Sequence, residues 1–104
     1  MVELTKDTDK LICCVYKTYL ERRNNGMLKV DASRFEDNFY TSDEKLSKWH
    51  ISDVNESLIE LSKAKYIRLT ITGAFSLEPP LLIHMENRFK NGVRDVVEMV
   101  SKFL

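Results

Sequence analysis

The sequence predicts a mostly helical α+β domain in which three or four N-terminal helices precede a short β-hairpin and a long C-terminal helix. Two observations carry this prediction. Apolar residues repeat every three or four positions through most of the chain, which is typical of amphipathic helices. Between about residues 66 and 77 they recur at every second position instead, which is typical of half-buried strands. The 104 residues are the usual length of one domain, so residues 1–104 are treated as a single unit.

Composition and charge limit the classes of protein to which the chain can belong. Its 16 Lys and Arg residues balance 16 Asp and Glu residues, so it lacks the overall basic excess that marks many nucleic-acid-binding domains. This balance is still compatible with a locally basic face. No apolar run approaches the roughly 20 residues that a membrane-spanning helix requires. The segment from Met1 to Asp7 is too acidic and too polar for a secretory signal, so we expect a cytoplasmic protein.

A first amphipathic helix is predicted near the N-terminus. Thr8 or Asp7 can cap it, and Asn24-Asn25-Gly26 ends it. Its apolar residues have the i, i+3, i+4, i+7, i+8 spacing that places them on one face; they are Ile12, Val15, Tyr16, Tyr19 and Leu20. Cys13 and Cys14 adjoin this face. Because neighbouring cysteines on a helix cannot pair without strain, we interpret them as small apolar residues beside the core, with an intermolecular bridge or a reactive thiol as alternatives.

Two capping boxes predict short helices in the middle of the chain. In each box a hydroxyl residue is followed three positions later by Glu: Ser33-Arg34-Phe35-Glu36 and Thr41-Ser42-Asp43-Glu44. The first box would open a helix through Phe39, and the second a helix through Leu46 and Trp49. The helix that precedes the next long one is therefore either Ala32–Phe39 or Ser42–Trp49.

A further helix and a hairpin follow. Ser52 or Asp53 caps the helix, whose apolar residues Val54, Leu58 and Leu61 are spaced by four and three, and it ends near Lys63-Ala64-Lys65. From residue 66 to 72 the apolar and polar residues alternate, which puts Ile67, Leu69 and Ile71 on one face of a strand. Gly73 marks a turn, and residues 74–77 form the return strand. A hairpin this short must pack on the helices to be stable.

The last predicted helix, about residues 79–103, has a longer apolar stripe than a small core can cover. Pro79 and Pro80 fit its first turn, and Gly92 interrupts it. Its C-terminal half would leave an apolar patch exposed, which predicts a twofold dimer. The alternative is that this half folds back onto the first helix. The candidate dimer residues are Phe89, Val93, Val96, Val97, Val100, Phe103 and Leu104.

Two stretches resemble winged helix-turn-helix domains. Residues 54–67, with Val54, Leu58, Leu61 and Tyr66-Ile67, are similar to the pattern V-x-x-x-L-x-x-L-x-x-x-G-(Y/L)-I of a recognition helix and first wing strand. Residues 75–87 resemble the segment that joins the second wing strand to a C-terminal helix in multiple-antibiotic-resistance-type, phenolic-acid-type and YjcQ-like proteins. The resemblance covers roughly residues 41–90. Lys65 stands where the pattern has Gly, and Glu78 where the joining segment has Thr.

The resemblance implies a small transcriptional regulator that binds double-stranded DNA as a dimer, with residues 54–65 in the major groove. Asn55 is the best residue for reading a base edge, while Asp53, Glu56 and Glu60 would repel phosphates. An alternative function is therefore a protein-interaction module, adaptor or antirepressor that does not bind DNA. The candidate DNA-binding residues are Lys45, Lys48, Ser52, Asn55, Ser57, Ser62, Lys63, Lys65 and Arg68.

The sequence predicts no catalytic, metal or cofactor site. His50 follows Trp49 in a turn, where a capping or surface role is expected, and His84 is near Glu86 and Arg88, where a surface ion pair is expected. The three glycines do not form a phosphate-binding loop, and no nucleophile, base and orienting residue are close in sequence.

Overall fold

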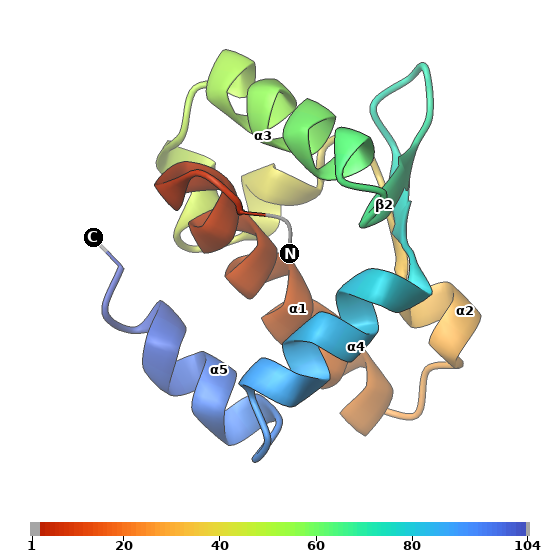
Figure 1. Cartoon of the computed structure of the whole chain (residues 1–104), viewed down its shortest axis with the longest axis vertical. Helices are drawn as coiled ribbons and strands as arrows, with labels where there is room; N and C mark the ends of the chain where they lie inside the picture. Colours follow the sequence, from red (N-terminus) through yellow and green to blue (C-terminus); the bar gives the residue numbers. More distant parts are fainter. Residues whose placement is uncertain (1–2, 104) are drawn as a thin grey trace.

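The computed structural model describes residues 3–103 as a mostly helical α+β fold with a small antiparallel sheet at one side (Figure 1). The first half contains helix α1 (Lys6–Asn24), the one-turn helix α2 (Lys29–Ala32), strand β1 (Arg34–Phe35) and the 3₁₀ helices η1 (Phe39–Ser42) and η2 (Leu46–Lys48). The second half contains α3 (Ile51–Lys63), β2 (Ile67–Leu69), β3 (Phe75–Leu77), α4 (Pro79–Arg88) and α5 (Val93–Val100).

Helix α1 lies at the centre of the fold, between α3 on one side and α5 on the other (Figure 1). Its predicted stripe is buried except for Leu20, which is half-buried. Leu11, Cys13 and Cys14 are buried as well, because α1 is covered on more than one side. The helix ends at Asn24, as predicted, and the end is a Schellman motif in which the Met27 N–H donates to the Arg22 carbonyl and Gly26 has a φ of 91°.

The sheet has the strand order β1-β3-β2, so the last strand in sequence is the central one. Phe35, Phe75 and Leu69 are opposite one another on the inner face, and the Phe35 and Phe75 rings stack at 5.1 Å. The prediction of a helix from Ser33 through Phe39 is therefore wrong over most of its length. Pairing with β3 and burial of Phe35 outweigh the local capping signal at Ser33.

The segment between β1 and α3 forms η1 and η2, not a regular α-helix from Ser42 to Trp49. The Asp43 carboxylate accepts hydrogen bonds from the N–H groups of Lys45 and Leu46 and so caps the second 3₁₀ turn. Leu46 is buried against the core. Helical turns do occur here, as the second capping box indicates. They do not extend into a regular α-helix, because Leu46 is the one buried side chain that anchors η2.

The predicted hairpin is present with shorter strands than expected. The Thr70 N–H donates to the Ala74 carbonyl, and the Gly73 N–H to the Thr70 carbonyl, so the chain is already turning at residue 70. Gly73 has a φ of 97°, which an L side chain adopts with strain. The prediction that Ile71 is on the buried face is wrong, because it lies in this turn and is fully exposed.

The prediction of one long helix over residues 79–103 is also wrong, because the helix is interrupted between Phe89 and Gly92. Gly92 has φ 65° and ψ −129°, a conformation open mainly to glycine. The break lets α5 turn back and pack on α1 (Figure 1). An ion pair between Arg88 and Asp9, with N–O distances of 2.6 and 3.0 Å, ties the end of α4 to α1.

Candidate interaction surface

Helix α3 is fixed at its C-terminal end by a second Schellman motif. The Lys65 N–H donates to the Ser62 carbonyl and the Tyr66 N–H to the Leu61 carbonyl. Lys65 has a φ of 64°, a conformation that glycine adopts with less strain than an L residue. At the other end the N-cap residue is His50 and the helix begins at Ile51, so the prediction of Ser52 or Asp53 as the cap is wrong by two or three residues.

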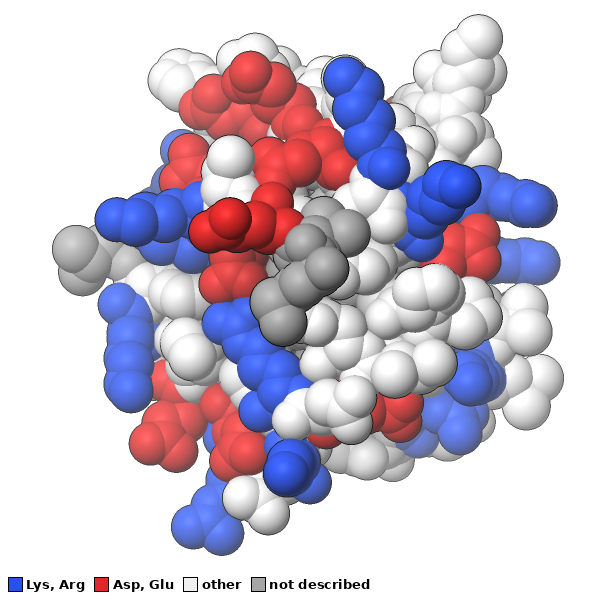
Figure 2. All heavy atoms as spheres, in the orientation of Figure 1, with Lys and Arg blue, Asp and Glu red and all other residues white. Residues whose placement is uncertain are grey.

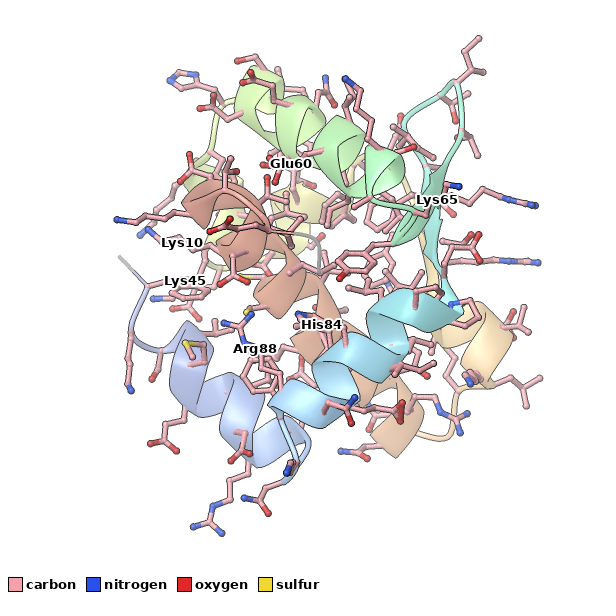
Figure 3. All side chains as sticks on the ribbon, in the orientation of Figure 1. Lys10, Lys45, Glu60, Lys65, His84 and Arg88 are labelled. Carbon is pink, nitrogen blue, oxygen red and sulfur yellow. The ribbon has the colours of Figure 1, made fainter. Side chains whose placement is uncertain are left out.

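Glu60 connects α3 to the start of α1 (Figure 3). Its carboxylate accepts hydrogen bonds from the Thr5 N–H at 2.8 Å, the Thr5 hydroxyl at 2.9 Å and the Thr8 hydroxyl at 2.9 Å. Partial burial opposes ionisation, but these three donors outweigh it, and the pKa of Glu60 lies below its usual value. Glu60 therefore serves as a cap for α1, and its carboxylate is already occupied.

The predicted DNA-reading residues of α3 do not all reach solvent. Ser52, Asn55 and Lys63 are exposed as expected, and Ser62 is half-buried. Ser57 is only 4% exposed, on the same face as Val54 and Leu58, so its prediction as a surface contact is wrong. Positions 54, 57, 58 and 61 form one helix face, so Ser57 lies with the apolar residues and not on the solvent face.

The five predicted cations do not all lie on one face. Lys45 and Lys65 are on opposite sides of the view in Figure 3, and the Lys45 ammonium donates to the Phe103 carbonyl at 2.9 Å. Arg68 extends from β2 with its side chain 80% exposed and its nearest carboxylate, Glu78, at 3.8 Å. Lys48 is exposed just before α3. Only Lys63 comes from the exposed face of α3 itself.

Acidic and apolar side chains dominate the exposed surface of α3. Asp53 and Glu56, with Asp7 from α1, line a groove of about 470 Å³ between the two helices. Figure 2 shows acidic side chains over this end of the molecule. Ile51 and Ile59 are 49% and 47% exposed. Neither isoleucine was predicted as a surface contact. The 3.6-residue period puts Ile59 opposite Leu61, whereas Ile51 is on the flank of the buried face near Leu58 and is exposed at the first position of the helix.

The candidate dimer residues are mostly used within the monomer. Phe89, Val96 and Val100 are buried, so their prediction as interface residues is wrong, and Val93 and Phe103 are half-buried. Val97 remains 42% exposed. Leu104 lies outside the described residues. The fold-back alternative is the arrangement that the structure has, since α5 covers α1.

The two thiols are buried, one histidine is stacked and the other is exposed. Burial raises the pKa of the Cys13 and Cys14 thiols to about 12, consistent with small core residues. His84 stacks on Tyr66 with ring centroids 5.7 Å apart, and His50 is exposed at the start of α3. Within residues 3–103, no three His, Cys, Asp or Glu residues are grouped so that they could hold a metal ion.

Comparison with protein-family models, with curated proteins and with solved structures finds no match to this chain. In the part of the chain that the structure describes, no helix combines the length and the apolar character needed to cross a bilayer.

Proposed function

We propose that the chain is a winged-helix domain that binds a protein partner through α3 and the β2–β3 hairpin. The order α1, β1, helical turns, α3, β2, β3 supports the winged-helix assignment, as does a sheet in which β3 pairs with both other strands. In this assignment α3 is the recognition helix and the hairpin is the wing.

The observation that carries the proposal is the chemistry of the α3–hairpin surface. Ile59 is exposed and lines a groove together with the carboxylates of Asp53 and Glu56, and Ile51 at the start of α3 and Ile71 in the hairpin turn are exposed as well. A surface for DNA needs cations that meet phosphates, and carboxylates there oppose binding. Apolar anchors with a charged rim are typical of protein interfaces. The partner surface should therefore be apolar at its centre and basic at its rim.

A DNA-binding regulator is the second candidate. Exposed Asn55 and Ser52 on α3 favour it, as do the exposed cations Lys63, Lys65 and Arg68 near its C-terminal end. These residues would have to bind DNA against the repulsion of Asp53 and Glu56. That cost is why the protein-binding function is preferred.

Site-specific photo-crosslinking in cells that make the protein tests the proposal. A photoreactive amino acid at Ile59 or Ile71 should give a crosslinked product with one defined protein. The matched control is Ile83 on α4, which is also exposed but lies outside the α3–hairpin surface. Equal crosslinking from all three positions, or none from Ile59 and Ile71, would argue against a protein partner on this surface.

A further inference from the structure

A second candidate site is a cavity of about 450 Å³ between α1 and the chain from β1 to η2. Its floor is apolar and well packed, since Cys14, Val15 and Leu46 are each 1% exposed. Phe35 and Phe39 also line it, and Phe39 meets Phe35 edge-on at 5.8 Å. The volume and the partly exposed aromatic wall at Phe39 fit a small organic molecule.

The rim of this cavity is negatively charged. Four carboxylates line it, against two cations, Lys17 and Arg22. Arg22 is committed elsewhere, because its Nη1 donates to the Ala32 and Arg34 carbonyls at 3.2 and 2.7 Å and its guanidinium covers the Phe35 ring at 4.3 Å. The four carboxylates belong to Glu21, Glu36, Asp43 and Glu44.

Three of these carboxylates have no counter-charge in the structure. Asp43 accepts two backbone N–H groups, but among the described residues Glu21, Glu36 and Glu44 form no side-chain hydrogen bond and no ion pair. The cavity therefore offers its ligand a negative rim, an aromatic wall and an uncharged floor. Burial raises the pKa of the Cys14 thiol to about 12, so the floor carries no thiolate at neutral pH.

We propose that this cavity binds an organic ammonium ion with an apolar or aromatic body. The ammonium group is attracted by the rim carboxylates and by the face of Phe39, and the body packs on the accessible part of the Phe39 ring, above the covered side chains of Val15 and Leu46. A carboxylate or phosphate ligand is disfavoured, because it would approach four negative groups with only Lys17 unengaged. The site does not depend on the α3–hairpin interface, so either proposal can fail without the other.

Phenethylamine, a phenyl ring with a positively charged ammonium group, is a suitable test ligand. Two controls have a similar body but a different charge: 2-phenylethanol is neutral and phenylacetate is negatively charged. Each compound is titrated into ¹⁵N-labelled protein, and the amide shifts of residues 36–46 are followed by NMR. Phenethylamine should saturate these shifts at millimolar concentration or below, at least about fivefold more tightly than either control. No saturation up to about 10 mM, or equal binding of phenylacetate, would overturn the proposal.

Variants then test which groups hold the cation. The double variant Glu36→Gln/Glu44→Gln should weaken phenethylamine binding about three- to tenfold, because exposed charge pairs contribute little each. Phe39→Leu should weaken it about two- to fivefold by removing the aromatic face. The control Glu98→Gln on α5, outside the cavity, should leave affinity unchanged. If Glu36→Gln/Glu44→Gln and Glu98→Gln had equal effects on affinity, the rim carboxylates would not be what recognises the ligand.

Discussion

Replacing Lys65 with glycine should make the protein more stable, although the change deletes a whole side chain. Lys65 adopts a φ of 64° in the Schellman motif that ends α3. An L residue in this conformation is destabilised by about 1–2 kcal/mol relative to glycine, because Cβ approaches the following carbonyl oxygen. Glycine also gains about 0.4–1 kcal/mol of conformational freedom in the unfolded chain, which opposes the gain. The net increase in the free energy of unfolding should be about 0.5–1 kcal/mol.

Thermal and urea unfolding of Lys65→Gly, followed by circular dichroism, measures this effect. The midpoint temperature should rise by about 2–8 °C. Lys65→Ala is the matched control, because it removes the same charge and length but keeps Cβ. Its free energy of unfolding should stay within about 0.5 kcal/mol of the parent. If Lys65→Gly were no more stable than Lys65→Ala, strain at residue 65 would not be the correct explanation.

Further predictions concern the chain break, the packing of α5 and the two thiols. Gly92→Ala should lower the free energy of unfolding by about 1–3 kcal/mol, because the backbone conformation at this position is strained for alanine. If residues 79–103 formed one continuous helix, the same substitution would raise the free energy of unfolding instead. Urea unfolding of the variant distinguishes these outcomes. Val96→Ala should cost about 2–3 kcal/mol and Val97→Ala less than about 0.5; equal effects would contradict the packing of α5 on α1. Burial raises the pKa of Cys13 and Cys14 to about 12, so the unfolded thiols ionise first. The free energy of unfolding should therefore be at its full value below pH about 8.5 and should decrease as the pH rises from there toward about 12. The thiols of the folded protein should react slowly with Ellman's reagent near neutral pH, and rapid labelling would refute their burial.

Local sequence signals were sufficient where one element is decided by its own residues. The 3.6-residue period located α1 and α3, because each buries a continuous apolar stripe. Alternation and Gly73 located the hairpin, because the turn requires a positive φ at that glycine. Asn24-Asn25-Gly26 located the end of α1 for the same kind of reason.

Tertiary contacts decided the elements that were predicted wrongly. Ser33 starts a capping-box pattern, but Phe35 gains more by joining β3 in the sheet than by extending a helix. The stripe from Leu82 to Phe103 reads as one helix, although Gly92 permits a turn that lets Val96 and Val100 reach α1. Periodicity alone cannot distinguish a stripe that packs on the same chain from one that packs on a second copy.

The candidate surface was predictable only in part. Exposure of Asn55 and Lys63 followed from the period of α3, whereas the burial of Ser57 required knowing where the buried face is centred. The separation of Lys45 from Lys65 depends on how η2 and the hairpin sit around α3, which no sequence spacing encodes. The commitment of Glu60 to Thr5 and Thr8 likewise joins residues more than fifty positions apart.

Binding to mixed-sequence duplex DNA is the measurement that tests the preferred function most directly. Fluorescence anisotropy with the purified chain at about 50 and 200 mM salt separates the two candidates, because phosphate contacts make affinity fall steeply with salt. With Asp53 and Glu56 on the exposed face of α3 and the cations dispersed, we expect no binding even at about 50 mM salt. Binding that is strong at about 50 mM and collapses at about 200 mM would contradict the protein-binding function and favour a DNA-binding regulator.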